Sequence, residues 1–286
     1  MPKFFSLLLL CALLATPTLA QQGDPKNPDA APTTQRAHKR ALVFNKTEGF
    51  KHSSISTSID VFKQMDATSE VFEFVVTDDV AHFDKDKLNT YDVVVFCLTT
   101  GEIKLSESQK AALLEFITSG KGGFVGIHSA TDTFYQWPQF GEMLGGYFDH
   151  HPWGAGDTVT IKNEQPKNPI TLPWGDQPFE LKEEIYQFKE PYDRKKQDVL
   201  LSLDTTKTDM TKPNIKRTDK DFAVAWTKTY GKGRVFYTSL GHNEAVWKDP
   251  RFQAHLMAGL QWVTHAEHGK GAPATQPAAA AGQKAK

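Results

Sequence analysis

The chain has 286 residues, of which 39% are hydrophobic and 23% are charged. This composition is ordinary for a globular protein and excludes collagen-like, coiled-coil and wholly disordered chains. The 33 basic and 34 acidic side chains leave a formal net charge of −1. Because this balance attracts neither phosphate backbones nor anionic membranes, we expect no nucleic-acid partner.

The first 20 residues have the pattern of an export signal. Lys3 precedes an apolar run, Phe4–Ala15, and Thr18–Ala20 provides a small-residue cleavage site. The run is shorter than the ~20 apolar residues of a membrane-spanning helix. We therefore expect an exported protein, periplasmic or extracellular, with no transmembrane segment after signal removal; a retained anchor is the alternative. Only Cys97 would then remain, so no internal disulfide is expected.

Two further segments differ in composition from the rest of the chain. Residues 21–39 are polar and contain three prolines, which is typical of a disordered linker. Residues 266–286 are rich in Ala, Pro and Lys and lack aromatic side chains, so we expect a disordered tail. Between them, residues 40–265 contain no internal repeat and no second linker, and we expect one domain.

Strand and helix patterns alternate through the first half of this domain. Apolar runs predict buried strands at Ala41–Phe44, Val71–Val76, Val93–Phe96 and Gly123–Ile127. Between them, apolar residues recur at helical spacing from Ile55 to Met65, and a capping-box pattern at Ser106–Gln109 opens a helix that ends at Gly120. This alternation predicts right-handed βαβ units and a parallel sheet.

The second half changes character. Strand patterns without intervening helices occur at Thr158–Lys162, Asp198–Leu203, Phe222–Lys228 and Val235–Ser239. The turn before the last of these strands predicts a hairpin, and Asp249-Pro250 opens a final helix. The predicted fold is therefore α/β, with a mostly parallel, doubly wound sheet, helices on both faces and an antiparallel extension.

Polar residues cluster where the predicted strands end, and ligands of an open parallel sheet bind beyond these carboxyl ends. Three of the ten histidines fall there, namely His52, His128 and His242. Thr100 and Asp132 follow the third and fourth strands and are expected to bind substrate. His150 and His151 are expected in a loop that folds over the same edge.

Imidazoles that converge at such an edge act as general acids and bases or as metal ligands. His128 and His242 are candidates for both roles, with zinc or manganese as the candidate ion. Their spacing is not a strong metal signature, because the chain contains neither His-Glu-x-x-His nor Cys-x-x-Cys. A structural hydrogen bond is the alternative for each histidine, and His255 is expected on the surface of the last helix.

Nucleophilic catalysis has weaker support in the sequence. Gly126–Ala130 has the strand–turn–helix context of a nucleophile elbow, but His128 occupies the central position where Ser or Cys would lie. Cys97 ends an apolar strand and is expected to be an inert core thiol. A cysteine hydrolase that uses Cys97 is the competing hypothesis, and it predicts inactivation by thiol reagents.

Aromatic residues occur in the same segments as these polar groups. They are Trp137, Trp153, Trp174, Trp247, Tyr135, Phe148 and Tyr186. Because sugar rings stack on aromatic faces, Trp137 and Tyr186 are candidates for substrate binding, with core packing as the alternative. Strand alternation puts Glu184, Tyr186 and Phe188 on one side, so Glu184 is either a carboxylate partner for a histidine or part of a solvated edge.

These segments resemble the ThuA-like, or trehalose-utilisation, domain family. The resemblance extends from about Ala41 to Val263 and rests on many collinear motifs. They are Leu42–Phe44, Gly49–His52, Tyr91–Phe96, Thr99–Gly101, Gly122–Asp132, Trp137-Pro138, Gly145–Phe148, His151-Pro152, Glu184–Tyr186 and Gly241-His242.

The resemblance implies a flavodoxin-like fold similar to class I glutamine amidotransferases. It also implies a link to disaccharide utilisation through oxidised (keto) sugars. The recurring polar positions of the family carry over to His52, His128, His151, Glu184 and His242. Since the amidotransferases use a Cys where this chain has His128, amidotransferase activity is not expected.

The leading hypothesis is an exported enzyme of carbohydrate utilisation that acts on a small glycoside or ketosugar as a hydrolase, lyase or isomerase. His128, His242 and Glu184 would be catalytic, with His128 and His242 as ligands if a divalent metal is bound. His52, His151, Thr100, Asp132, Tyr186 and Trp137 would bind substrate. The alternative is a non-catalytic carbohydrate-binding or interaction module, which tolerates loss of titratable groups if its aromatic residues remain. The sequence does not indicate an oligomeric state.

Overall fold

The computed structural model describes residues 38–265. The predicted signal of residues 1–20, nearly all of the predicted linker and the predicted tail of residues 266–286 lie outside this range. The first strand, β1, begins at Lys39, and the last helix, α6, ends at Val263.

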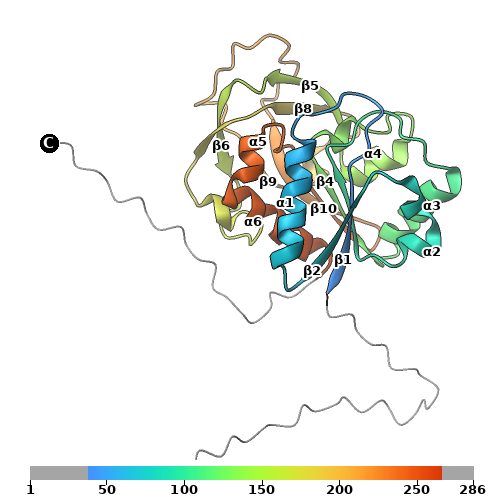
Figure 1. The fold of residues 1–286 in the computed structure, drawn as a ribbon. Helices are drawn as coiled ribbons and strands as arrows, with labels where there is room; N and C mark the ends of the chain where they lie inside the picture. Colours follow the sequence, from blue (N-terminus) through green and yellow to red (C-terminus); the bar gives the residue numbers. More distant parts are fainter. Residues whose placement is uncertain (1–37, 266–286) are drawn as a thin grey trace, which may run out of the picture. The chain divides into compact units, whose positions relative to one another are not determined.

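Five parallel strands form one half of the main sheet, in the order β2–β1–β3–β4–β11. Figure 1 labels β1, β2 and β4 among them. The five strands are β1 (Lys39–Phe44), β2 (Phe72–Thr77), β3 (Val93–Cys97), β4 (Gly123–Ile127) and β11 (Gly233–Thr238). This is the 2-1-3-4-5 order of flavodoxin-like folds, so the predicted fold class is confirmed. The carboxyl ends of all five strands meet at one edge, which is called the carboxyl edge below.

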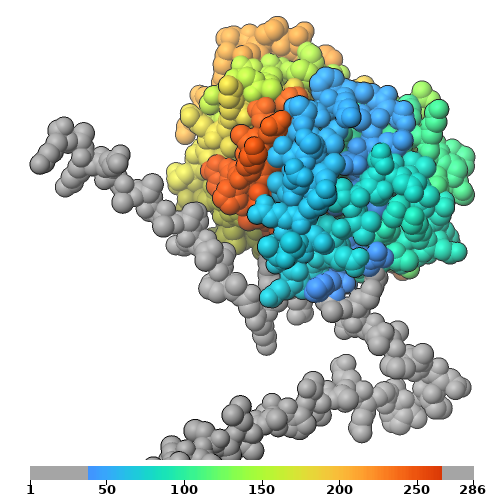
Figure 2. Space-filling view, viewed as in Figure 1, coloured from blue at the N-terminus to red at the C-terminus, as the bar shows by residue number. Residues whose placement is uncertain are grey.

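Helices cover both faces of this parallel half. On one face lie α1 (Ile55–Thr68), α5 (Glu244–Lys248) and α6 (Pro250–Val263), and on the other lie α2 (Lys85–Leu88), α3 (Glu107–Thr118) and α4 (Pro138–Leu144). Figure 2 shows α1 in blue against α5 and α6 in orange and red. Short 3-10 turns complete the helical elements, at η1 (Val80–Phe83), η2 (His128–Asp132), η3 (Leu172–Trp174) and η4 (Arg194–Lys196).

The continuous apolar runs form strands because both of their faces are buried under helices. In β1, Ala41 and Val43 pack into the core beneath α1 and α6, whereas Leu42 and Phe44 pack into the core beneath α3 and α4. In β3, Val93 and Val94 divide between the same two cores. Successive side chains of a strand point to opposite faces, so each run contributes to two apolar layers.

Local signals fix the helix ends as predicted. The Ser106 side chain accepts a hydrogen bond from the Gln109 backbone N–H, and the Gln109 side chain accepts one from the Ser106 N–H, which completes the capping box of α3. The Asp249 side chain caps α6, with Pro250 at the first helical position. These caps satisfy backbone donors that the helices leave unpaired.

Antiparallel strands extend the sheet beyond β11, in the order β10–β9–β6–β7. They are β10 (Ala223–Tyr230), β9 (Asp198–Leu203), β6 (Thr158–Asn163) and β7 (Phe179–Lys182). The predicted hairpin is confirmed: β10 pairs with β11 through a turn at Gly231, whose φ of 61° suits glycine. The predicted antiparallel extension is therefore also confirmed.

A separate two-stranded ribbon contains β5 (Tyr147–Trp153) and β8 (Ile185–Lys189). The expectation that His150 and His151 lie in a loop is wrong, because both residues belong to β5 and His150 pairs with Gln187 of β8. The pairing is interrupted by two register shifts, so the strand lacks the regular alternation that would reveal it in the sequence. In Figure 1 the ribbon lies at the same end of the sheet as the blue loop that follows β1.

Candidate functional site

His128 occupies a strained turn at the end of β4. Its φ is 53°, in the left-handed region, and its side chain is fully buried. A non-glycine residue held in such a sparsely populated conformation costs about 1–3 kcal/mol, and such residues cluster at functional sites. The backbone thus has the form of a nucleophile elbow, as the sequence predicts, with an imidazole in the central position.

Hydrogen bonds fix the tautomer of His128. Its Nδ1 lies 2.7 Å from the backbone carbonyl of Ser239, and because a carbonyl only accepts, Nδ1 donates its proton there. In the neutral ring Nε2 then carries a lone pair, which accepts a hydrogen bond from the Tyr186 hydroxyl at 2.8 Å. A backbone carbonyl on the far nitrogen is the usual way to orient a metal-ligating histidine.

Two further side chains meet His128 Nε2. His242 Nδ1 lies 3.3 Å from it, and Glu184 Oε1 lies 3.7 Å from it. His242 Nδ1 is in turn 3.3 Å from Glu184 Oε1. Metal–ligand bonds of about 2.0–2.2 Å in a tetrahedral site place neighbouring ligand atoms about 3.4 Å apart. The three separations are therefore compatible with a small divalent cation between these atoms.

His52 completes a four-residue group that is called the His/Glu cluster below. The ring of His52 lies 4.8 Å from that of His128 and 5.2 Å from that of His242, edge to face in both cases. One ligand atom from each of His52, His128, Glu184 and His242 lies within 4.8 Å of the others. The loops after β1, β4 and β11 and the residue before β8 supply these side chains, so the cluster lies at the carboxyl edge.

Burial and neighbouring charges shift the pKa values of the cluster histidines in opposite directions. Burial, reinforced by the nearby His242, lowers the pKa of His52 to about 4. Burial and then His52 lower the pKa of His128 well below its usual value. Burial opposes protonation of His242 as well, but the hydrogen bond to Glu184 and the charges of Glu184 and Glu183 raise its pKa overall. His52 and His128 are thus neutral at pH 7, which is the form that binds metals.

The hydroxyl of Tyr186 competes with a metal ion for one ligand atom. Its hydrogen bond occupies the lone pair of His128 Nε2 that would coordinate an ion. Tyr186 is buried and its ring packs on His128, with ring centroids 4.6 Å apart. Metal binding at His128 therefore requires this hydrogen bond to be exchanged for the metal–ligand bond.

The structure brings His151 to the margin of the cluster. Its Nδ1 lies 3.5 Å from Glu184 Oε2, on the side of the carboxylate opposite His242. The His151 side chain is 42% exposed, whereas that of Glu184 is only 8% exposed. Glu184 thus links the buried imidazoles to an imidazole with an edge in solvent.

The hydrogen bonds and ring contacts of the other predicted substrate-binding residues are with residues outside the cluster. Thr100 Oγ1 donates to the Phe50 carbonyl at 2.8 Å and so anchors the loop that carries His52. Asp132 accepts a hydrogen bond from the Tyr135 hydroxyl at 2.6 Å. Trp137 is buried in the core, where its ring packs against Phe134 and Phe140 and is not brought to the cluster.

Several expectations about aromatic and cysteine residues can now be judged. Trp137, the tryptophan predicted to bind substrate, is buried, as are Trp153, Trp174 and Trp247, which favours core packing for all four. Phe50 instead has the largest exposed fraction, 64%, of any large hydrophobic side chain among residues 38–265, and the centroid of its ring lies 4.8 Å from that of His52.

Cys97 is buried, and burial raises the pKa of its thiol to about 12, as expected of an inert core cysteine.

The expectation that His255 lies on the surface of the last helix is wrong. The residue is fully buried in α6, and its Nδ1 donates to the Ile170 carbonyl at 2.8 Å. The segment before η3 covers this position, and Trp174 packs edge-on against the His255 ring. Helical periodicity alone does not show that an irregular segment covers the outer side of a helix.

Sequence reasoning also overlooked Glu183, which strand alternation points away from the site. The structure buries it completely, with its carboxylate against the backbone of Gly241, His242 and Asn243. Two adjacent acids at the start of a strand give no signal that both are buried.

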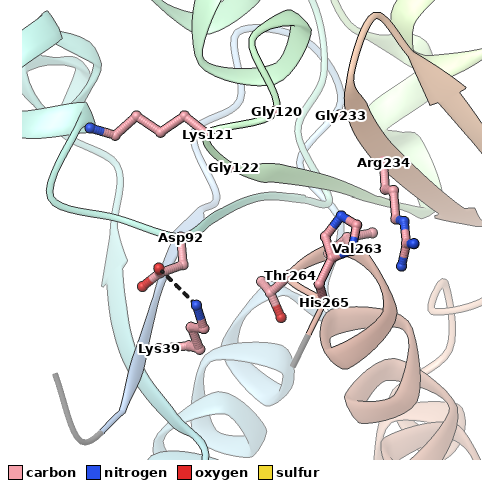
Figure 3. Close-up of a pocket in the computed structure, with 10 residues that line it drawn as sticks. All are labelled: Lys39, Asp92, Gly120, Lys121, Gly122, Gly233, Arg234, Val263, Thr264 and His265. Carbon is pink, nitrogen blue, oxygen red and sulfur yellow. Dashed lines mark hydrogen bonds and ion pairs between the residues drawn. The ribbon is translucent and has the colours of Figure 1, made fainter. Parts of the chain in front are cut away.

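A small cavity lies at the opposite end of the sheet (Figure 3). It is lined by Lys39, Asp92, Gly122 and Gly233, which lie at the amino ends of β1, β3, β4 and β11, and by residues at the end of α6. Lys39 and Asp92 form an ion pair there at 3.5 Å. This cavity is remote from the carboxyl edge and from the His/Glu cluster.

No helix within residues 38–265 is long and apolar enough to cross a membrane. No curated protein matches the chain. Two solved structures of ThuA-like proteins are similar to it. That from Bacteroides uniformis is 22% identical, with a TM-score of 0.62, and the match covers 82% of this chain and 94% of that one. That from Parabacteroides merdae is 18% identical, with a TM-score of 0.61, and the match covers 84% and 95%.

A β-galactosidase from Rahnella sp. shares the fold at 14% identity, with a TM-score of 0.50 over 80% of this chain and 32% of the enzyme. The sequence model of the ThuA family, described as trehalose utilisation, matches residues 40–263. This match spans every parallel strand of the sheet except the first residue of β1, together with all four residues of the cluster. The chain therefore belongs to the ThuA family.

Proposed function

We propose that this protein is an exported enzyme of carbohydrate utilisation that acts on a ketosugar or small glycoside with a divalent metal, zinc or manganese, held by the His/Glu cluster. The observation that carries the proposal is the convergence of three imidazoles and one carboxylate at the carboxyl edge. Export is proposed from the signal pattern of residues 1–20.

The donor set supports a catalytic rather than a purely structural metal. His128 Nε2, His242 Nδ1 and Glu184 Oε1 lie 3.3–3.7 Å apart, and this set of two nitrogen ligands and one oxygen ligand suits zinc or manganese and leaves one tetrahedral position open. When bound, the ion would polarise a carbonyl or hydroxyl oxygen of the sugar as a Lewis acid. His128, His242 and Glu184 would hold it, with His52 next to them in the cluster.

The protein groups around the cluster supply proton transfer. If Glu184 Oε1 held the ion, Glu184 Oε2 would still face His151 Nδ1, 3.5 Å away at the exposed margin of the cluster. His151 has a solvent-exposed edge and is the group that exchanges a proton with substrate or water. Phe50 presents an exposed ring beside His52 on which a sugar face can stack.

This arrangement favours proton abstraction next to a carbonyl, as in a lyase or isomerase, over covalent hydrolysis. Among residues 38–265, the Cys97 thiol is buried and held neutral by its raised pKa. Ser129 Oγ lies 3.5 Å from His52 Nδ1, longer than the about 2.6–3.2 Å typical of an activated nucleophile and its base. A ketosugar provides the acidic carbon–hydrogen bond that acid–base chemistry needs.

The second candidate is a carbohydrate-binding module. The observation that favours it is the exposed Phe50 ring next to a site without an activated nucleophile. A binding module would retain its sugar affinity when the imidazoles are replaced, because stacking and hydroxyl contacts need no titratable group.

The test is turnover of ketosugars and small glycosides by the purified protein, loaded with zinc or manganese, beside His128→Asn. Asparagine tolerates the left-handed backbone of this position better than alanine does, so the fold should survive. We expect turnover to fall at least about 100-fold in this variant, because one residue of the cluster is lost. His82→Asn, on η1 outside the cluster, is the matched control. Unchanged turnover in His128→Asn would contradict the proposal, and retained sugar binding without turnover in either protein would favour the binding module.

A further inference from the structure

The loop between β11 and α5, residues 239–243, is hydrogen-bonded to every other segment that supplies the His/Glu cluster. The Ser239 carbonyl accepts from His128 Nδ1 at 2.7 Å. The Gly241 carbonyl accepts from the hydroxyl of Ser54, two residues after His52, at 3.0 Å. The third link runs to Glu183, the residue before Glu184. Since His242 itself belongs to this loop, its conformation bears on all four residues of the cluster.

Glu183 makes the most extensive of these links. Its Oε1 accepts the backbone N–H groups of Gly241 at 3.1 Å and His242 at 2.5 Å, and its Oε2 accepts that of Asn243 at 3.1 Å. Three successive N–H groups bound to one carboxylate leave the loop little freedom in φ and ψ. The direction in which His242 projects from the backbone is thereby set.

Other contacts hold the opposite side of the same loop. The Gly241 carbonyl also accepts from Trp247 Nε1 at 2.7 Å. The Asn243 side chain donates to the backbone carbonyls of Lys182 at 2.8 Å and Ala155 at 2.9 Å. Gly241 has a φ of 118°, and a Cβ there would lie 3.3 Å from the Trp247 ring, so the turn depends on glycine. The loop is therefore clamped between Glu183 and these groups.

A buried acid is a costly way to fill space. Glu183 is 0% exposed, and an apolar side chain would fill the position without the cost of removing a carboxylate from water. A carboxylate can accept hydrogen bonds from several N–H groups at once, and these directional bonds order the backbone that carries the N–H groups. Glu183 precedes Glu184 in the chain and accepts the backbone N–H of His242, so its place in the fold points to a role in the geometry of the site.

We infer that Glu183 is a positioning residue that fixes His242 in the His/Glu cluster and thereby sets the affinity of the site for its metal ion. The inference rests on the proposed metal-dependent function. Glu183 does not itself belong to the group of ligand atoms. It acts through the backbone of residues 241–243, as a partner in the outer shell of the site.

The test compares the zinc dissociation constant of the wild type with that of Glu183→Gln. The amide keeps one acceptor oxygen but turns an NH₂ towards a backbone N–H, so at least one of the three hydrogen bonds is lost. We expect the dissociation constant to rise about 10- to 100-fold. We also expect faster hydrogen exchange of the amides of residues 241–243 in the protein without metal. Glu183→Asp, which keeps the carboxyl group and shortens the side chain, replaces Glu183→Gln if the latter does not fold.

Glu164→Gln is the matched control. Glu164 is a partly buried carboxylate that accepts from the Ser202 hydroxyl at 2.6 Å and pairs with Arg194 at 3.0 Å, with no link to the cluster. Its substitution should lower thermal stability and leave the zinc dissociation constant within about 2-fold. The control separates a general loss of stability from a specific loss of metal affinity.

The outcomes separate this inference from the proposed function. If the wild type binds zinc and Glu183→Gln binds it within about 2-fold as tightly, the positioning role is overturned while the metal site stands. If the wild type binds neither zinc nor manganese, the proposed metal dependence fails. In that case, hydrogen exchange of the backbone amides alone tests whether Glu183 positions His242. Unchanged exchange at residues 241–243 in Glu183→Gln would overturn the inference, and faster exchange would support it.

Discussion

Tyr186 gives the sharpest prediction of the metal-site account. In the structure its hydroxyl donates to His128 Nε2 at 2.8 Å, and both side chains are buried. A metal ion on Nε2 would take the same lone pair, so binding must break this hydrogen bond. Tyr186→Phe removes the bond only from the form without metal. We therefore predict that this variant binds zinc more tightly than the wild type.

The magnitude follows from the hydrogen bond that is lost. A buried intramolecular hydrogen bond contributes about 0.5–1.5 kcal/mol net, which corresponds to a dissociation constant about 2- to 13-fold lower in Tyr186→Phe. The lower part of this range is expected, because His242 Nδ1, 3.3 Å from His128 Nε2, is a substitute donor in the variant. The metal-free variant should be less stable to urea by about 1 kcal/mol.

Competitive zinc titration with a chromophoric chelator measures the effect. Tyr192→Phe is the control, because the hydroxyl of the buried Tyr192 donates to Asp221 at 2.8 Å, away from the cluster. It should lower stability to a similar extent without changing the zinc dissociation constant. Weaker zinc binding by Tyr186→Phe would refute the reasoning, since it would mean that the Tyr186 hydroxyl supports the ion rather than competing with it.

Three further predictions concern acid stability, substrate binding and thiol chemistry. Burial lowers the pKa of His255 from 6.5 to about 4. The imidazole is therefore protonated at a higher pH in the unfolded chain than in the native chain, and the free energy of unfolding falls as the pH falls from about 6.5 towards about 4. Between pH 7.5 and 5.0, urea unfolding of His255→Gln should show about 2 kcal/mol less loss of stability than the wild type, and an equal loss in both would contradict this assignment. Phe50→Ala should raise KM for a sugar substrate about 2- to 13-fold with little change in kcat, since an exposed stacking ring is removed; an unchanged KM would remove Phe50 from the substrate site. The buried Cys97 should react with thiol reagents only on unfolding, so rapid inactivation of the native enzyme would restore the cysteine-hydrolase hypothesis.

Most of the fold could be predicted because its strands are buried on both faces. Runs such as Val93–Phe96 are rich in β-branched residues and have no polar alternation, as expected of central strands. The cap at Asp249 marks the start of α6 in the sequence as well as in the structure. The strand β5 could not be predicted in this way. It contains the polar stretch Asp149–His151 and pairs irregularly with β8, so its conformation depends on the partner strand rather than on local pattern.

The histidines of the candidate site could be proposed from topology alone. Strand ends in a parallel sheet share one edge, and His52, His128 and His242 all follow such ends. The resemblance to the ThuA family strengthened the choice of Glu184, which the structure brings to 3.3 Å from His242. The buried position of Glu183 depends instead on a backbone loop almost 60 residues later in the chain, and no local pattern encodes that contact.

The central claim is that the His/Glu cluster holds a metal ion, and metal content tests it most directly. The purified protein would be reconstituted separately with zinc and manganese, dialysed and analysed for bound metal beside His128→Asn, His242→Asn and the control His82→Asn. The account predicts about one ion per chain in the wild type and the control, and loss of that ion in the two cluster variants with the fold retained. A wild-type protein that retains neither ion, or cluster variants that retain it fully, would contradict the claim.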